Sequence, residues 1–522
     1  MSFPLRPLTD FRALSLSPRT CLIIFCLFQL TLWTMGPWVI RFNPVYDTME
    51  SFVWGNQWQW GYDKHPPFTA WMTALFGKLT SPPDLGLYFL AQLSIVVTFL
   101  AVWRLAKEYL DELNAILAVI MLTGILHYSN LSERVTPDTM QSPLWALLAL
   151  SFYLAVNQQS LRYWLLTGLL TGMAILTKYQ VAVLLLPMGI ALIVSEQGLA
   201  TLKSSGPWLA AGLALLIASP HLIWLYQHNF PAFHYLNASY VSDPAASMDD
   251  WSSRLLVPLD FAQSCLGNTA LLALLCWPLF KCPKKTHPHN KPTNKPRFKQ
   301  TYLFAIALGP TLVTLIIGAF YAQELVHRWS TPYFAWLPLG LLFLLCRDVN
   351  RSVFNKILIR SLVLMAILCS LRMGYLYYKP YKSDDYWRAD EYTPAAESMA
   401  KAEQLWSQHY DTPLPYLGGA HYHVMALVSR ASGNTIPFSN LEIRNSLWMS
   451  EADFKKHGGI IVLERNSNDF QETAIKKKYP GAHFLGTFEF RPHIPKNIKD
   501  IQHSVIDYYL VVPQKREAIK IL

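Results

Sequence analysis

The stretch YLFAIALGPTLVTLIIGAFYA, residues 302–322, contains no charged side chain. A run of about 20 apolar residues is what an α-helix needs to cross about 30 Å of hydrocarbon. Similar apolar blocks recur along the chain, and only 15% of its 522 residues are charged, against about 25% in soluble domains. The pattern predicts a polytopic α-helical membrane protein with about eleven spans. They cover residues 20–42, 85–103, 113–128, 139–157, 162–177, 179–195, 207–226, 258–280, 302–322, 332–346 and 357–376.

The Lys and Arg residues decide the predicted orientation, because cytoplasmic loops carry an excess of them. Segment 281–300 has seven Lys and Arg and no acidic residue. Two further groups agree with it: Arg6, Arg12 and Arg19 at the N-terminus, and Arg347, Arg351, Lys356 and Arg360 in a later loop. If the chain starts in the cytoplasm and changes sides at each of the eleven spans, five segments lie on the outer face: 43–84, 129–138, 227–257, 323–331 and 377–522. We expect a multi-pass protein of the bacterial inner membrane with its C-terminal domain in the periplasm.

Several classes of protein are disfavoured by the composition. The net charge of +10 is explained by the basic loops, so we expect no nucleic-acid partner. The seven cysteines lie in or beside apolar blocks and form no CxxC pair, which argues against a zinc site or a disulfide framework. The apolar run Cys21–Ile40 lacks a small-residue cleavage site and is interpreted as a retained first span.

The predicted organisation is a transmembrane domain over residues 1–380 and an α/β domain over 381–522. Hydropathy falls after about residue 380. Strand-like runs at Gly459–Leu463, His483–Phe490 and Val505–Val512 alternate with helical patterns at Pro394–His409 and Asp469–Lys478. Within the first outer loop, Phe68–Leu79 is too short to span and is expected to be a helix lying in the interface plane.

The first outer loop, 43–84, carries the densest set of charged groups beside the membrane, where charges are costly and are a functional hint. Asp47 and Glu50 are three residues apart, so on a helix they share one face. Paired carboxylates suit a general base or a divalent-metal ligand. An N-terminal helix cap with a partner one turn on explains the same spacing.

Lys64 and His65 precede the Pro66-Pro67 pair, and a residue before proline is held in an extended conformation. A basic group fixed there suits a lipid phosphate, although an ordinary interfacial anchor explains it too. Arg328, beside Trp329 in a short outer loop, suits a bidentate phosphate contact or a snorkelling arginine.

Other polar groups in the outer loops have simpler explanations. The loop with Glu133, Arg134 and Asp138 offers another acid–base cluster, but Glu133 and Arg134 are expected to be solvated or paired with each other. Asp138 precedes a span and suits an N-cap. His221, His228 and His234 lie near one loop, but their spacing is too loose to favour a metal site.

The chain resembles the dolichyl-phosphate-mannose-protein mannosyltransferase-like superfamily of the GT-C fold, which includes bacterial transferases that add aminoarabinose or other sugars to lipid A. The motif is Asp47-x-x-Glu50 with Trp54, then Gln59-Trp-Gly-Tyr-x-Lys-His-Pro-Pro-x-x-x-Trp71. Further similar stretches are Thr177-Lys178-Tyr179, Ser219-Pro220-His221 through Pro231, Gly309-Pro310, and Arg328-Trp329-Ser-Thr-Pro332. Together they cover about residues 20–380.

The resemblance implies that Asp47 is the catalytic base and that Glu50 orients the acceptor. It implies that donor phosphate is bound by Lys64, His65, Lys178 and Arg328, and that Trp54, Tyr62, Asp138, Tyr179 and Trp329 line the substrate site. The aminoarabinose-type enzymes have lysine directly before the Pro-Pro pair, whereas this chain has His65 there. That departure argues against carrying over the aminoarabinose specificity.

The resulting hypothesis is an inverting glycosyltransferase that moves a sugar from a polyprenyl-phosphate donor to a lipid, glycan or protein acceptor. Lys and Arg can stabilise a monophosphate leaving group, so no cofactor is required, with a divalent cation as the alternative. The competing hypothesis is a transporter or flippase of lipid-linked saccharides. Transporters usually place functional charges in mid-span and repeat their two halves, and neither feature is visible here. A membrane scaffold has no specific support.

Overall fold

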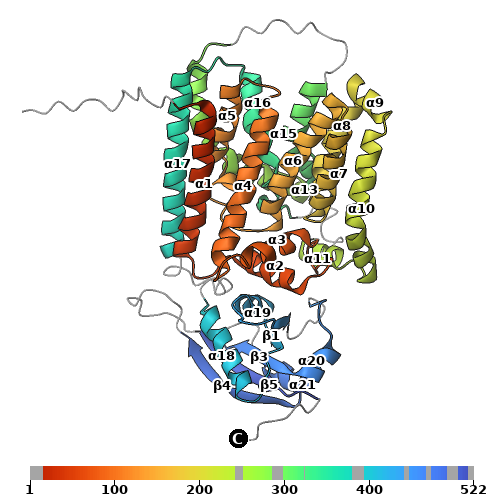
Figure 1. Cartoon of the computed structure of the whole chain (residues 1–522), viewed down its shortest axis with the longest axis vertical. Helices are drawn as coiled ribbons and strands as arrows, with labels where there is room; N and C mark the ends of the chain where they lie inside the picture. Colours follow the sequence, from red (N-terminus) through yellow and green to blue (C-terminus); the bar gives the residue numbers. More distant parts are fainter. Residues whose placement is uncertain are drawn as a thin grey trace, which may run out of the picture.

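The computed structural model describes residues 16–240, 251–284, 298–321, 324–378, 393–439, 446–465, 472–490 and 504–514. A bundle of helices forms one layer, and a small α/β unit made of the C-terminal residues lies against one end of it (Figure 1). Arg6 and Arg12, and the basic residues of 285–297, lie outside the described residues, as does the predicted domain boundary near residue 380.

Six long helices dominate the described part of the bundle. They are α1 (Pro18–Ile40), α4 (Asp84–Ala106), α6 (Pro137–Gln158), α10 (Gly206–Gln227), α15 (Phe298–Tyr321) and α17 (Arg351–Tyr378). A seventh segment long and apolar enough to cross a membrane runs over Leu255–Lys281, through α13 (Trp251–Thr269), α14 (Leu271–Cys276) and η4 (Trp277–Lys281). Tyr179–Ile193, which includes η3 (Tyr179–Val181) and α8 (Ala182–Ile193), is long and apolar enough only together with α9 (Glu196–Leu202), and the two are bent by 105°, as in a broken span or a re-entrant loop. The chain is a multi-pass membrane protein.

Three of the eleven predicted spans are shorter helices, so that count stays a prediction. They are α5 (Glu112–Ile120), α7 (Leu161–Ile175) and α16 (Leu337–Leu345). The reason for the short length of these helices is clearest for α5, in which every residue from Ala115 to Ile120 is fully buried. A helix enclosed by other helices does not have to match the thickness of the lipid. After α5 the chain continues in two short 3₁₀ turns, η1 (Met121–Gly124) and η2 (Leu126–Tyr128).

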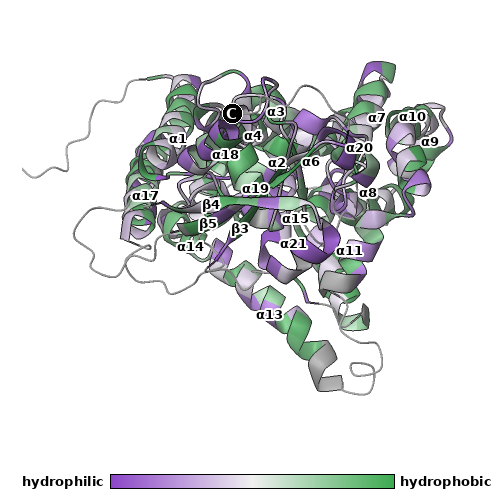
Figure 2. Cartoon of the chain, turned by 90° about the horizontal axis from the view of Figure 1, so that it is seen from below, coloured by the Kyte–Doolittle hydropathy of each residue, from purple (hydrophilic) through white to green (hydrophobic). Residues whose placement is uncertain are grey.

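The rim of the bundle is apolar. Leu215, Leu216 and Phe320 are among its most exposed large side chains. Seen from below, hydrophobic colouring extends over the peripheral helices (Figure 2). Exposed apolar side chains of this kind suit contact with lipid rather than with water.

Three short helices lie across the end of the bundle that faces the α/β unit: α2 (Tyr46–Gln57), α3 (Phe68–Gly77) and α11 (Pro231–Tyr240) (Figure 1). The helix predicted at 68–79 is confirmed as α3. The chain leaves α2 through Trp58, whose φ of 45° puts it in the left-handed region and ends the helix. The turn brings the charged residues of 59–65 back beneath α2.

The α/β unit has a five-stranded sheet in the order β2-β1-β3-β5-β4. Strands β1 (Tyr416–Gly419), β2 (Ile436–Ser439) and β3 (Gly459–Glu464) are parallel, and β4 (Ala482–Phe490) and β5 (Ser504–Val511) are antiparallel. The helices are α18 (Ala395–Ser407), α19 (His421–Val428), α20 (Glu451–His457) and α21 (Glu472–Lys478). The predicted β3, β4, β5, α18 and α21 are confirmed. The sequence prediction missed β1, β2, α19 and α20, whose four to eight residues carry little periodic signal.

The α/β unit shares a hydrophobic core with α2. Met49 and Val53 on α2 belong to the same buried cluster as Val424 and Met425 on α19. Beside it, Arg430 donates to both carboxylate oxygens of Asp84, at 2.7 and 3.0 Å. The helix that carries Asp47 and Glu50 is therefore packed between the bundle and the α/β unit.

Candidate active site

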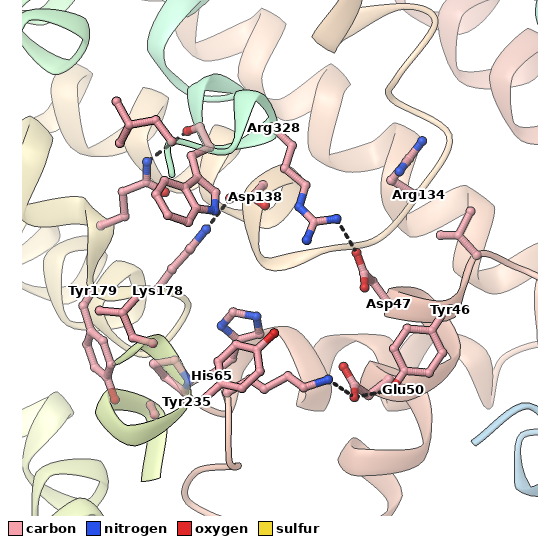
Figure 3. A pocket seen from close by; sticks show the side chains of 18 of the residues that line it. Tyr46, Asp47, Glu50, His65, Arg134, Asp138, Lys178, Tyr179, Tyr235 and Arg328 are labelled. Atoms are coloured by element: carbon pink, nitrogen blue, oxygen red, sulfur yellow. Dashed lines mark hydrogen bonds and ion pairs between the residues drawn. The ribbon is translucent and has the colours of Figure 1, made fainter. Parts of the chain in front are cut away.

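A cavity of about 550 Å³ opens at the end of the bundle next to α2. Nine of the predicted site residues line it: Asp47, Glu50, Lys64, His65, Asp138, Lys178, Tyr179, Arg328 and Trp329. They come from five separate parts of the chain, and Figure 3 shows most of them around one space. The outer loops predicted from the Lys and Arg pattern therefore meet at one end of the molecule.

Two predicted lining residues, Trp54 and Tyr62, do not line the cavity, and this corrects the prediction. Their rings stack on each other, with centroids 4.9 Å apart, and both are almost fully buried. The Tyr62 hydroxyl donates to the backbone oxygen of Trp54 at 2.7 Å. Trp54 also lies under the Lys64 ammonium, 5.8 Å from its ring centroid. The stacked pair therefore belongs to the core that packs against the first outer loop, and not to the wall of the cavity.

Asp47 is the carboxylate best placed to act on a ligand. It lies in the first turn of α2, whose N-cap is Val45, so the helix-cap explanation does not hold. Its side chain keeps 34% of its surface exposed, and among the described residues it forms one ion pair, a long contact of 3.5 Å with Arg328. Burial raises the pKa of Asp47, and Arg328 opposes that rise. A carboxylate with a raised pKa is a stronger base.

The Glu50 carboxylate is held by more and shorter contacts than the Asp47 carboxylate. Its Oε1 accepts hydrogen bonds from the Tyr46 hydroxyl at 2.5 Å, from Lys64 Nζ at 2.7 Å and from His421 Nε2 at 2.8 Å. Burial alone would raise the pKa of Glu50, but Lys64 and His421 lower it to about 2. Glu50 is thus ionised at neutral pH and committed to three donors, which leaves it little capacity to take a proton.

The two basic residues before Pro66 differ in charge. Burial alone lowers the pKa of Lys64, but Glu50 and Asp63 raise it well above its ordinary value, so Lys64 is a cation. Burial, followed by the nearby Lys178, lowers the pKa of His65 to about 3. His65 therefore lines the cavity as a neutral ring that can donate a hydrogen bond but supplies no positive charge at pH 7.

Lys178 lies on the opposite side of the cavity from Glu50 (Figure 3). Its Nζ is 2.6 Å from Asp138 Oδ1 and 5.3 Å from the centroid of the Trp329 ring. The N-cap of α6 is Thr136, not Asp138, which corrects that alternative. Asp138 instead lies in the first turn and fixes the position of Lys178.

The prediction for Glu133 and Arg134 was wrong. The Glu133 side chain is fully buried and bonds to Arg41 Nη2 at 2.7 Å and to Arg372 Nε at 2.9 Å. Arg41, Arg134 and Arg372 also line the cavity, and the sequence prediction missed Arg41 and Arg372 as site residues. Arg372 lies inside a predicted apolar span, and a charge in such a span was the signal that could have found it.

His221 joins the first loop to α10. Its Nδ1 lies 2.6 Å from the backbone oxygen of Trp60, so it donates there, and its Nε2 accepts from the Tyr179 hydroxyl at 2.6 Å. His228 Nδ1 bonds to the backbone oxygen of Trp224. Among the described residues, no three His, Cys, Asp or Glu side chains are grouped as a metal site would require.

The comparisons with known proteins agree with this architecture. Residues 64–224 match the model of a family described as dolichyl-phosphate-mannose-protein mannosyltransferase. A search of curated proteins by sequence found no match. The crystal structure of ArnT from Cupriavidus metallidurans bound to undecaprenyl phosphate matches with a TM-score of 0.60 at 12% identity, over 95% of this chain and 99% of that one. The apo structure of the same protein matches with a TM-score of 0.53, with the same identity and coverage.

The chain is a polytopic membrane protein of the GT-C fold, and it shares its fold with ArnT over 95% of its length. Over residues 64–224, the predicted resemblance to the dolichyl-phosphate-mannose-protein mannosyltransferases is confirmed. That stretch includes Lys64, His65, Asp138, Lys178 and Tyr179.

Proposed function

We propose that this protein is an inverting glycosyltransferase that moves a sugar from a polyprenyl-phosphate donor to a lipid, glycan or protein acceptor. The observation that carries the proposal is the position of Asp47. It is a carboxylate with a raised pKa, partly exposed to a cavity that also contains Lys178 and Arg328. An inverting transfer needs this combination of one base and a cationic site for the leaving phosphate.

In the proposed reaction, Asp47 accepts the proton of the acceptor hydroxyl while the acceptor oxygen bonds to the anomeric carbon. The bond from that carbon to the phosphate oxygen breaks, and its electron pair leaves with the phosphate. Lys178 and Arg328 neutralise that charge, and His65 can donate a hydrogen bond to it. Because Lys and Arg supply the charge, no metal is required, with a divalent cation as the alternative.

Glu50 has a different role in this proposal from the one that the resemblance implies. Its three donors make it a positioning residue, which fixes Lys64 at the edge of the cavity. Lys64 is then a third cation for the donor phosphate, held in place by an acid that does not take part in proton transfer.

The donor class is supported by the ArnT structure of the same fold, which is bound to undecaprenyl phosphate. A polyprenyl tail can remain in lipid while the phosphate and sugar enter a cavity at the end of the bundle. The basic segments 281–300 and 347–360 favour a cytoplasmic location for the other end. We therefore propose the bacterial inner membrane, with the cavity and the α/β unit in the periplasm.

Asp47→Asn tests the base assignment, because it keeps the shape of the side chain and removes its basicity. Sugar transfer from a polyprenyl-phosphate donor in membranes should fall by about 10²- to 10⁴-fold, the usual contribution of a general base. Asp348→Asn, an exposed carboxylate in the loop between α16 and α17, is the matched control. Full transfer by a folded Asp47→Asn protein would remove Asp47 as the base. If a lipid-linked saccharide reaches the other face equally well with and without the protein, the flippase alternative is removed.

The acceptor can be identified by mass profiling of lipid A, glycans and membrane proteins from cells with and without this protein. A shift equal to one sugar residue in one of these fractions names the acceptor class. If no fraction changes under conditions that express the protein, the transferase proposal is contradicted.

A further inference from the structure

The lining of the cavity carries more positive than negative side chains, and three of the positive ones are arginines at the end of α1, in α17 and in the loop before α6. Six Lys and Arg side chains line the cavity, against three Asp and Glu. Lys64 has Glu50 as its partner and Lys178 has Asp138. Arg41 and Arg372 both bond to one carboxylate, Glu133, which is fully buried.

Arg134 lies next to this shared carboxylate, and its guanidinium forms no ion pair or hydrogen bond with any other described residue. Its Nε is buried without a partner, and its side chain lines the cavity. Three guanidinium groups around one carboxylate leave an excess positive charge in a place with little water. Charges removed from water cost several kcal/mol each unless they are compensated, so this cluster favours the binding of an anion.

Arg134 lies on a different side of Asp47 from Lys178. In Figure 3, Lys178 is at one end of the cavity, Arg328 and Asp47 are in the middle, and Arg134 is beyond Asp47. In an inverting displacement, the nucleophile and the leaving group are on opposite faces of the anomeric carbon. The base lies on the face of the nucleophile, so an anion bound on the far side of Asp47 from Lys178 belongs to the acceptor. Arg328 lies between Lys178 and Asp47 and can still face the leaving phosphate.

We propose that Arg134, together with Arg372, binds an acidic group of the acceptor, a phosphate or a carboxylate, next to the hydroxyl that Asp47 deprotonates. The planar fork of arginine suits both kinds of oxyanion. The inference rests on the proposed function and narrows the acceptor to anionic lipids, glycans or proteins. It assigns Arg134 to acceptor binding and leaves the donor phosphate to the Lys178 side.

The test uses the full-length protein in phosphatidylcholine nanodiscs, saturated with undecaprenyl phosphate, with inorganic phosphate as the probe. Phosphate should raise the thermal midpoint in a saturable way while undecaprenyl phosphate is bound. Arg134→Gln should weaken this response by at least about tenfold and leave the affinity for undecaprenyl phosphate within about twofold. Arg162→Gln, which removes a positive charge from an exposed position on α7, should change neither.

Arg134→Lys is the second variant, in case Arg134→Gln does not fold. It keeps the charge and loses the fork, so its phosphate response should be intermediate. Because Glu133 keeps Arg41 and Arg372 as partners, neither variant leaves a buried carboxylate without a cation.

Three outcomes would overturn the inference. The first is an unchanged phosphate response in Arg134→Gln. The second is a wild-type response that disappears when undecaprenyl phosphate is added, since that indicates one shared site. The third is a wild-type response that disappears in phosphatidylglycerol nanodiscs, since that assigns the arginines to a lipid headgroup. Failure to bind undecaprenyl phosphate would instead contradict the proposed function, and an Arg134-dependent phosphate response would still support the anion site.

Discussion

Nε2 of His421, in the α/β unit, lies 2.8 Å from Oε1 of Glu50, a residue 371 positions earlier that lines the cavity. Because a carboxylate oxygen can only accept, the imidazole N–H donates this bond. Glu50 in turn accepts from Lys64. The α/β unit therefore contacts the network that positions a cavity cation, in addition to packing against α2 through the shared hydrophobic core.

His421→Ala should reduce sugar transfer without abolishing folding. A hydrogen bond to a charged group contributes about 1.5–3 kcal/mol, and Glu50 keeps Tyr46 and Lys64 as donors. We expect a fall in kcat/KM of about tenfold, and partial recovery in His421→Gln, which retains an N–H donor. The measurement is a transfer assay combined with a thermal midpoint. His457→Ala, on the exposed face of α20, is the control; equal losses in both variants would mean that His421 has no specific role.

The acid limb of the pH profile should depend on Asp47. Burial raises the pKa of Asp47 and Arg328 lowers it. A base acts only when it is ionised, so transfer should fall as the pH drops through a pKa above the ordinary carboxylate range. Arg328→Gln removes the lowering influence, so it should shift the acid limb of kcat/KM to higher pH, while Arg328→Lys should shift it less. A shift to lower pH in Arg328→Gln would contradict the assignment.

The sequence predicts that Asp47 and Glu50 share one helix because their spacing is local information. The strands β4 and β5 could also be predicted, because apolar and polar residues alternate over their eight or nine residues. The contacts of Arg41 and Arg372 with Glu133 and of His421 with Glu50 depend on which segments pack together over separations of 92, 239 and 371 positions. No local pattern specifies that packing. Trp54 and Tyr62 show the converse, since the resemblance implies that both line the substrate site and they instead stack in the core.

The buried Glu133 should be far more important for stability than an exposed acid with the same kind of partner. Its carboxylate is fully buried between Arg41 and Arg372. Removing one partner of a buried ion pair costs about 3–5 kcal/mol, so Glu133→Gln should lower the thermal midpoint by many degrees or prevent folding. The control is Glu112→Gln, which breaks an exposed pair with Arg19 worth about 0–1 kcal/mol. Similar effects of the two substitutions, measured by thermal unfolding in detergent, would show that the arginine cluster does not depend on Glu133.

The pH dependence of stability provides an independent check on Glu133. Burial alone raises the pKa of Glu133, but Arg41 and Arg372 lower it to about 2. A carboxyl group whose pKa is lower in the folded state stabilises the fold above its unfolded pKa of about 4.3. That contribution should be lost as the pH falls from about 4.3 through about 2. Glu133→Gln should abolish this part of the acid destabilisation, and an unchanged acid profile would mean that Glu133 is not the group responsible.

Gly55 should be essential to the position of α2. A Cβ added at Gly55 would lie 2.0 Å from the backbone oxygen of Ala70 on α3, so the two helices cannot keep their present distance. Gly→Ala inside a helix normally stabilises by up to about 1 kcal/mol. At Gly55 the clash should dominate, and overpacking of this kind costs about 1–3 kcal/mol. Gly189→Ala, at a position on α8 where a Cβ would meet nothing within 4 Å, should be neutral or stabilising.

Gly55→Ala should therefore lower the thermal midpoint, whereas Gly189→Ala should leave it unchanged or raise it. Because α2 carries Asp47 and Glu50, Gly55→Ala should also lower the rate of sugar transfer in protein that remains folded. Gly189→Ala should leave that rate unchanged. If both variants shift the midpoint in the same direction, the close contact between α2 and α3 is not what positions the acidic residues of the cavity.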